Sequence, residues 1–157
     1  MNLRRSVPYL WAAPVSLAAL PAALLCAATG GRMRISAGVL EAGGGILGPV
    51  LSRAVPGFAI SAITFGHVVL GAGADALEET RAHERVHVRQ YECWGVLFLP
   101  LYLGASLFAL ARGRSVYAGN VFERQACRES ELAAQTVMRS SMRRPLGGRT
   151  FAERMGP

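Results

Sequence analysis

The sequence is poor in charged residues, and two charged residue types are almost missing from it. Charged residues make up 17% of the 157 residues, against about 25% in average globular chains. Lysine is absent, and Asp75 is the one aspartate. With a hydrophobic fraction of 52%, this composition excludes a disordered chain, which needs low hydrophobicity and high charge. It also argues against a small domain that faces water on all sides.

Cysteines are few and far apart in the sequence. The three of them, Cys26, Cys93 and Cys127, form neither a disulfide framework nor a Cys-x-x-Cys metal site. The chain length predicts one domain, with or without a membrane anchor.

Basic charge exceeds acidic charge, with 17 arginines against 10 acidic residues and a net charge of +7. The densest group of arginines, at positions 139, 143, 144 and 149, lies among Gly, Ser and Pro without interleaved aromatic residues. Because no nucleic-acid motif accompanies it, we expect residues 139–157 to be a basic flexible tail and no nucleic acid to be a partner.

Three stretches lack charge: residues 6–31, 54–74 and 93–111. Each has close to the ~20 residues that are needed to cross a bilayer. The first follows Arg4 and Arg5, carries Tyr9 and Trp11 near its start, and is rich in Ala and Leu. It predicts an N-terminal hydrophobic anchor or a cleaved signal peptide over residues 1–31.

The second stretch is typical of β-structure. Residues 58–70 are rich in β-branched and aromatic residues and lie between Pro-Gly and Gly-Ala-Gly. Before them, residues 34–42, a turn of three glycines and residues 46–51 indicate strand, turn and strand. Residues 34–70 therefore predict a small antiparallel β-meander, at the start of a domain that we expect to cover residues 32–138.

Two polar helices complete the expected α+β domain. Asp75 can cap the first helix with Glu78 three residues later, and this helix runs to about Cys93. The second helix starts after Asn120 and runs to about Met138. Arg81, Arg85 and Arg89 recur every fourth residue of the first helix, and we expect them to pair with Glu78 and Glu92 on a solvated face.

The first helix contains His83-Glu84-Arg85-Val86-His87, an HExxH motif. Residues four apart lie on one helix face, so His83 and His87 can bind one Zn²⁺ at about 2.0–2.1 Å each. Glu84 lies just off that face, where it can act as general base on a zinc-activated water. The alternative is a charged, exposed helix whose histidines bind nothing, and Arg85 at a usually uncharged position favours that reading.

A catalytic zinc needs a third protein ligand and an open fourth position. No histidine follows His87, so the third ligand must be a carboxylate or His67. Glu123 is the best candidate, because a Glu with a small residue three positions later, here Ala126, resembles the third-ligand helix of the glutamate zincins, and the small residue lets that helix approach closely. Glu129 and Glu131 are weaker candidates, because they lie further into the helix. The alternative is that Asn120 caps this helix and that Glu123 is its capping-box partner.

HERVHVRQY at residues 83–91 and NVFERQA at residues 120–126 resemble the zincin-type metallopeptidases of bacteria, of the kind with a glutamate as third ligand. The resemblance covers roughly residues 60–130. It implies a zincin-like core in which a β-sheet packs on the HExxH helix and a second helix brings in Glu123. It also implies zinc as cofactor, His83, His87 and Glu123 as ligands, Glu84 as catalytic base and a peptide or protein as substrate.

These patterns predict a zinc peptidase that is attached to the bacterial inner membrane by one N-terminal anchor, or exported if that segment is cleaved. The alternative is a non-catalytic small membrane protein with a structural or degenerate HExxH site. The ligand set also makes a geometric prediction. Residues 93–111 must turn back, at Pro100 or Gly104, or lie buried, because a span would place His83 and Glu123 on opposite sides of the membrane.

Three further residues have candidate roles near the site. Tyr117 and His67 are candidate donors to an oxyanion, although a structural role is the commoner one for such residues. Gln90 follows His87 by three positions, where support of the metal ligand and plain packing are equally plausible.

Overall fold

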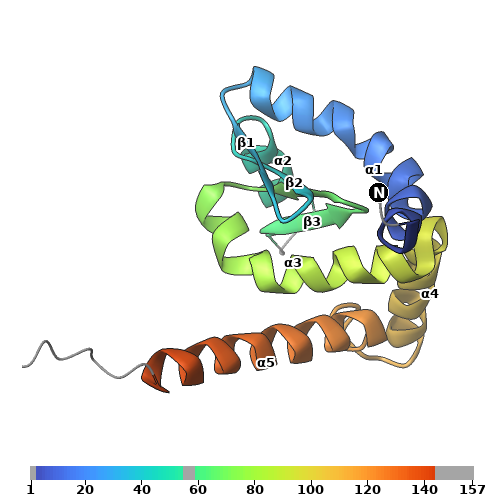
Figure 1. The fold of residues 1–157 in the computed structure, drawn as a ribbon. Coiled ribbons are helices and arrows are strands. Elements are labelled where there is room, and N and C mark those ends of the chain that lie inside the picture. Colours follow the sequence, from blue (N-terminus) through green and yellow to red (C-terminus); the bar gives the residue numbers. More distant parts are fainter. Residues whose placement is uncertain (1–2, 55–58, 144–157) are drawn as a thin grey trace, which may run out of the picture.

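The computed structural model describes residues 3–54 and 59–143, which form an α+β fold (Figure 1). This confirms the α+β class that the sequence predicts. The elements in chain order are α1 (Leu3–Ala28), β1 (Arg32–Ser36), β2 (Val39–Gly43), α2 (Leu47–Arg53), β3 (Ala62–Phe65), β4 (Val68–Gly71), α3 (Ala74–Trp94), a 3-10 turn η1 (Gly95–Leu97), α4 (Phe98–Ala111) and α5 (Val121–Arg143).

The four strands form a mixed sheet in the order β1-β2-β4-β3. β1 pairs with β2, and β3 with β4, in antiparallel fashion, whereas β2 and β4 are parallel. The expected antiparallel meander is therefore wrong. Residues 46–51 do not form a strand, because Leu47 and Leu51 place one apolar face of α2 in the core. β3 begins at the same end of the sheet at which β2 ends, since Gly43 and Ala62 both pair with Gly71.

Residues 58–70, which predict a single strand, form a hairpin instead. The chain reverses between β3 and β4 at Gly66, whose φ of +60° suits glycine. A side chain at this position would also meet Ser16 of α1, since an added Cβ would lie 2.2 Å from its Oγ. Phe58 itself lies outside the described residues. The hairpin makes β3 an edge strand of the sheet.

Helices cover both faces of the sheet. Alternate residues of the strands face opposite ways, so one set packs against α1 and the other against α3. The α1 side comprises Ala19, Ala23, Cys26, Ala42, Val68 and Leu70. The α3 side comprises Val39, Val69, Leu77 and Val88. The small residues of α1 recur at helical spacing, which lets this helix lie close to the sheet.

The remaining helices extend this layered arrangement. α5 runs alongside α3 on the side away from the sheet, and α4 closes one end of the molecule (Figure 1). The predicted helix end near Met138 is too early, since α5 continues to Arg143. The rest of the expected tail, residues 144–157, lies outside the described residues.

Capping differs between the two polar helices. The predicted cap at Asp75 is wrong: α3 begins at Ala74 with Gly73 as N-cap, and Asp75 lies in the first turn. Its charge still favours that end of the helix, where backbone N–H groups point outward. Asn120 does cap α5, because its Oδ1 accepts a hydrogen bond of 2.9 Å from the Phe122 N–H.

Residues 93–111 turn back, as the predicted convergence of His83 and Glu123 requires. The turn lies at neither Pro100 nor Gly104, both of which are inside α4. Proline is tolerated there because it is the third residue of the helix, where no intrahelical partner for its N–H is needed. The direction changes at Gly95 and again after α4, where the Ser106 hydroxyl donates to the Val116 carbonyl (3.2 Å).

Candidate metal centre

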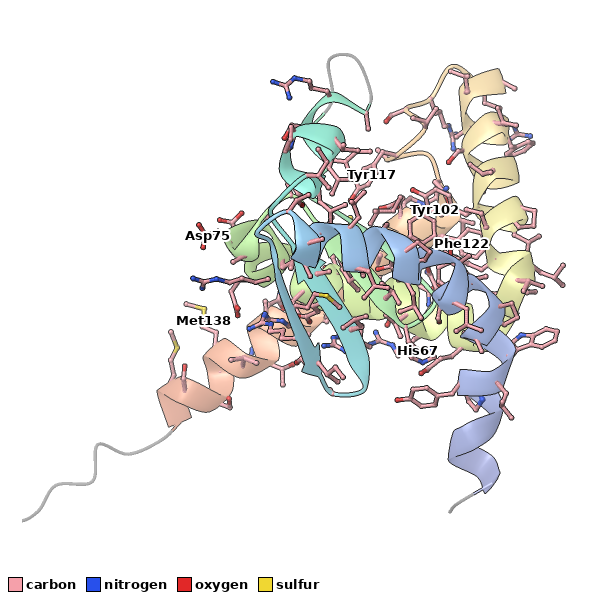
Figure 2. All side chains as sticks on the ribbon, turned by 90° about the horizontal axis from the view of Figure 1, so that it is seen from above. His67, Asp75, Tyr102, Tyr117, Phe122 and Met138 are labelled. Carbon is pink, nitrogen blue, oxygen red and sulfur yellow. The ribbon has the colours of Figure 1, made fainter. Side chains whose placement is uncertain are left out.

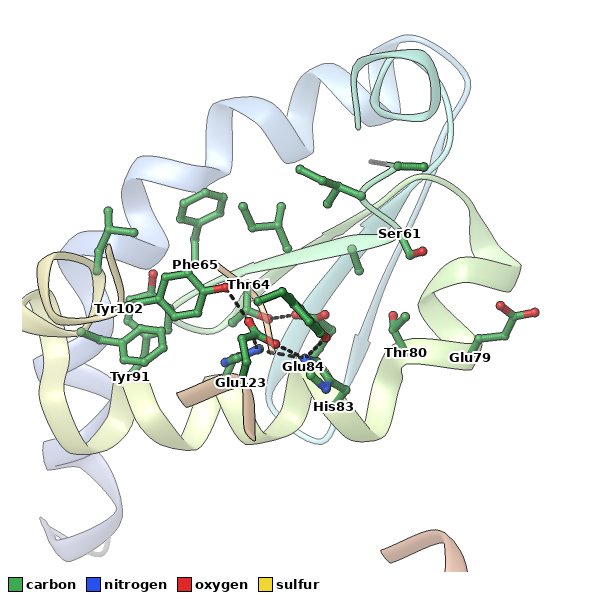
Figure 3. Close-up of a pocket in the computed structure, with 18 residues that line it drawn as sticks. Ser61, Thr64, Phe65, Glu79, Thr80, His83, Glu84, Tyr91, Tyr102 and Glu123 are labelled. Atoms are coloured by element: carbon green, nitrogen blue, oxygen red, sulfur yellow. Dashed lines mark hydrogen bonds and ion pairs between the residues drawn. The ribbon is translucent and has the colours of Figure 1, made fainter. Parts of the chain in front are cut away.

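Three side chains from two helices meet at one point. His83 and His87 lie one turn apart on α3, and Glu123 reaches them from the first turn of α5 (Figure 3). The two histidine Nε2 atoms are 3.1 Å apart. Glu123 Oε2 is 3.2 Å from Nε2 of His83, and Oε1 is 3.3 Å from Nε2 of His87. The donor atoms of this group all lie within 4.8 Å of one another.

These separations suit a tetrahedral metal ion. With bonds of about 2.0–2.1 Å, neighbouring ligand atoms around a tetrahedral zinc are about 3.3 Å apart. Glu123 Oε2 is buried and has no hydrogen-bond partner among the described residues, which is costly for a carboxylate oxygen. Two imidazoles and a carboxylate are also a donor set that zinc accepts in catalytic sites. The residues present therefore fit a zinc ion.

The approach of α5 to α3 depends on two local features. Ala126 is fully buried, so no bulky side chain separates the helices one turn after Glu123. Asn120 satisfies the helix end through Phe122, while the Glu123 carboxylate points to the histidines. Asn120 and Glu123 thus do not compete for the cap, and the capping-box alternative does not describe this helix.

Gln90 fixes the orientation of the His87 ring. Its side-chain NH₂ donates to the Phe122 carbonyl and to Gln125 Oε1, both at 3.1 Å, which leaves its own Oε1 as an acceptor. This oxygen lies 2.8 Å from His87 Nδ1, so Nδ1 carries the proton. In the neutral ring, Nε2 then keeps its lone pair; in the charged ring, which Glu123 favours, Nε2 also carries a proton and faces Glu123 Oε1 at 3.3 Å. Gln90 therefore supports the candidate ligand rather than merely packing beside it.

The environment of the three side chains favours opposite charges on His87 and Glu123. Burial raises the pKa of the Glu123 carboxyl, but the adjacent imidazoles of His83 and His87 and the hydrogen bond from Tyr102 outweigh it and hold this pKa well below its usual range. Burial lowers the pKa of His87, but the hydrogen bond and the charge of Glu123 outweigh it and leave this pKa raised. The Tyr102 hydroxyl donates to Glu123 Oε1 at 2.5 Å.

Glu84 lies beside the triad and at the wall of a cavity. Its Oε2 accepts a hydrogen bond of 2.6 Å from the Thr64 hydroxyl on edge strand β3. The cavity has a volume of about 420 Å³ and lies between β3, α3 and α4 (Figure 3). Its lining includes Glu84, all three side chains of the triad and the aromatic rings of Tyr91, Phe98 and Tyr102. A substrate in this cavity would thus lie against both the triad and the candidate base.

Arg85 points away from the cavity. Its charge, which is unusual at this position of an HExxH motif, therefore lies outside the candidate site. Its guanidinium donates to Glu41 Oε1 (2.9 Å) and to the Ser36 carbonyl (2.7 Å). Glu41 on β2 is buried and also accepts hydrogen bonds from Arg34 and Arg81. Sequence reasoning missed this carboxylate. Its signal was a single acidic residue in an otherwise apolar strand.

The other expected arginine pairs are only partly present. Arg81 does pair with Glu78, its expected partner. Arg89 pairs with Glu129 of α5 at 2.5 Å, and Glu92 instead lies 3.0 Å from His67. This face of α3 is therefore not simply solvated, because it joins the helix to the sheet and to α5.

The two candidate oxyanion donors differ in position. His67 stacks on the Tyr9 ring, with 4.1 Å between ring centroids, and does not line the cavity. The Tyr117 hydroxyl lies 3.3 Å from His83 Nε2 and does line it. Burial, together with the charge of Glu123, raises the pKa of Tyr117, so this phenol remains a hydrogen-bond donor at neutral pH.

Comparison of the chain with family models, with curated proteins and with solved structures gives no match.

Proposed function

We propose that this protein is a zinc-dependent hydrolase of peptide bonds. The observation that carries the proposal is the convergence of His83, His87 and Glu123 beside Glu84 at one cavity wall. The zincin-like reading of the fold, with His83, His87 and Glu123 as ligands and Glu84 as base, belongs to the same proposal.

The side chains of this site have distinct roles in the proposed reaction. A bound zinc ion supplies a Lewis acid and lowers the pKa of a coordinated water toward ~7. Glu84 accepts a proton from the water whose oxygen bonds to the peptide carbon, and returns it to the amine nitrogen as the C–N bond breaks. Thr64 holds one Glu84 oxygen, which keeps the carboxylate at the cavity. Tyr117 can donate to the carbonyl oxygen as charge develops there.

Zinc content of the purified protein tests the ligand set. We expect one zinc per chain by mass spectrometry of the metal, and loss of zinc in His83→Ala, His87→Ala and Glu123→Ala. His67→Ala is the matched control, because this histidine lies outside the triad and pairs with Glu92. The proposed site would be refuted if the wild type contained no zinc, or if His83→Ala had the same zinc content as the wild type.

Hydrolysis of a peptide library tests catalysis separately. Glu84→Gln should retain zinc and lose hydrolysis by a factor of about 10² or more, since general base catalysis typically contributes 10²–10⁴. A non-catalytic metal site predicts a different pair of results: zinc in the wild type, but no hydrolysis in either protein.

We also propose that the protein acts at a membrane, the bacterial inner membrane, to which the charge-free N-terminal stretch attaches it. Residues 8–28 of α1 form a helix that is long and apolar enough to cross a bilayer. The packing of α1 on the sheet favours a retained segment over a cleaved signal peptide, because cleavage would remove one layer of the core.

A further inference from the structure

Helix α4 is apolar around its whole circumference although most of it is exposed. Phe98 and Ala109 are its buried residues, and Tyr102 faces the site between them. A surface helix in water carries polar residues on its outer face. The outer face of α4 instead exposes Leu99, Leu101, Leu103, Leu107, Phe108 and Leu110.

The apolar surface continues from α4 onto α1. Tyr9, Leu10 and Trp11 are exposed on α1, and Trp94 is exposed just before η1. Trp11 packs on Gly95, where an added Cβ would lie only 2.4 Å from the indole nitrogen, so this part of α1 and η1 are in contact. In both views α4 and the N-terminal half of α1 form the same end of the molecule (Figures 1 and 2).

We propose that this end of the molecule, α4 with the N-terminal half of α1, lies in the surface of an anionic lipid bilayer. Tyr9, Trp11 and Trp94 lie where α1 meets the start of α4, and tryptophan and tyrosine are the residue types that membrane–water boundaries favour. Arg112 follows α4 and stacks on Phe108 at 4.4 Å, a position from which its charge can reach headgroups. The net charge of +7 adds attraction to anionic lipid.

The fold requires α4 to lie in the interface rather than to cross it. α3 precedes α4 and α5 follows it, and both return to the same triad. The 14 residues of α4 span only about 21 Å at 1.5 Å per residue, less than the ~30 Å hydrocarbon core. The chain after α4 also runs back along it, since Asn120 Nδ2 donates to the Tyr102 carbonyl (3.1 Å).

This placement brings the candidate metal centre to the lipid boundary. Tyr102 on the inner face of α4 binds Glu123, so the thickness of one helix, about 10–12 Å, separates the site from the bilayer. Leu99 is both exposed and part of the cavity lining, so the cavity meets the apolar surface. Granting the proposed peptidase function, the substrate class is a polypeptide segment held at the membrane surface.

The two tryptophans make the placement directly measurable, because Trp11 and Trp94 are the only ones in the chain. Full-length protein would be reconstituted with vesicles of phosphatidylcholine alone, or mixed with phosphatidylglycerol, and quenched by lipids brominated at known depths. Trp11→Phe and Trp94→Phe separate the two signals. We expect bromines near the headgroups to quench Trp94 most strongly, and vesicles with phosphatidylglycerol to bind more protein in flotation.

A pair of charge variants separates the contribution of α4 from that of α1. Leu103→Glu with Leu107→Glu should weaken vesicle binding by about tenfold or more and abolish Trp94 quenching, because charge is costly at the apolar boundary. Val137→Glu with Met138→Glu, at exposed apolar positions of α5, is the matched control and should do neither.

Unquenched Trp94 in vesicle-bound protein would show that α1 alone anchors the chain. A lipid-free dimer that Leu103→Glu and Leu107→Glu dissociate would assign the surface to a second copy. Either result overturns the proposal.

The substrate class has its own readout. One peptide, free and carrying a lipid tail, would be offered to the reconstituted protein. We expect faster hydrolysis of the vesicle-bound form, and loss of that preference in the Leu103→Glu, Leu107→Glu protein with hydrolysis of the free peptide unchanged. Equal rates for both forms in the wild type would refute the substrate class. The zinc content of the same samples distinguishes the two proposals. If lipid bromines quench Trp94 but the protein contains no zinc, the peptidase proposal is refuted and the membrane-surface proposal stands.

Discussion

Gln90 is the side chain through which the surroundings of the candidate site orient His87, a proposed metal ligand. It holds the proton of His87 on Nδ1 and bridges α3 to α5. We expect Gln90→Leu to lower zinc affinity by about 10- to 100-fold, the usual effect of losing such a partner. Competition with a chelator measures this affinity.

Gln125 provides the control for that measurement. Gln125→Leu removes a polar contact of Gln90 but leaves the bond between Gln90 and His87 in place. It should therefore bind zinc nearly as the wild type does. If both leucine variants bound zinc equally, Gln90 would be a packing residue only.

The opposite charges of His87 and Glu123 make the stability of the zinc-free protein depend on pH. The raised pKa of His87 contributes stability that is fully present below its unfolded value of about 6.5, and that is lost as the pH rises through the folded value. The lowered pKa of Glu123 contributes stability that is present above its unfolded value near 4.5, and that is lost as the pH falls. The pair therefore stabilises the zinc-free protein most between about pH 4.5 and pH 6.5, the pKa values of Glu123 and His87 in the unfolded chain.

Denaturation in the presence of a chelator tests this window. The difference in unfolding free energy between wild type and His87→Gln should shrink as the pH is raised from 6 toward 8. The decrease is at most about 1.4 kcal/mol for each pH unit by which the pKa of His87 in the folded protein exceeds that in the unfolded chain. Zinc affinity should rise over the same range, because the metal needs the neutral imidazole. A difference that grows with pH would contradict the charge pair.

At the scale of elements, Glu41 joins the motif helix to the sheet. Its buried carboxylate accepts hydrogen bonds from Arg34 on β1 and from Arg81 and Arg85 on α3. We expect Glu41→Gln to lower the unfolding free energy by about 2–3 kcal/mol, because charged hydrogen bonds at a buried group are lost. Chemical denaturation measures this change.

The exposed pair between Arg89 and Glu129 is the control for Glu41. Glu129→Gln should cost less than about 1 kcal/mol, because both side chains of the pair are open to solvent. Equal effects of the two substitutions would mean that Glu41 contributes no more than a surface ion pair.

Local patterns predicted the helices better than the strands. The spacing of four residues is enough to predict that His83 and His87 share a helix face. The capping residue Asn120, three positions before Glu123, is also visible in the sequence. Residues 46–51 predict a strand although they form α2, because Leu47 and Leu51, with few polar residues nearby, fit a strand as well as a helix. The parallel pairing of β2 with β4, and the approach of Tyr102 and Gln90 to the triad, depend on contacts between distant segments, which no local pattern encodes.

At the scale of the whole molecule, the apolar composition has two uses. Part of it fills the core between α1, the sheet and α3. Another part lies on the outer faces of α1 and α4, where no other described residue covers it. The first charge-free stretch of the sequence therefore serves as a core layer on one side and offers an apolar surface on the other.

Two neighbouring residues of α1 distinguish a core layer from a simple anchor. Ala23 is fully buried against the sheet, whereas Leu24, the next residue of the helix, is 63% exposed. Ala23→Leu should lower the stability of the reconstituted protein by about 1–3 kcal/mol through overpacking, and Leu24→Ala should leave it nearly unchanged. Thermal unfolding in detergent measures both, and mass spectrometry shows whether α1 is retained. A helix that only anchors the chain would tolerate Ala23→Leu as well as it tolerates Leu24→Ala. That result would show that α1 does not contribute to the packed core.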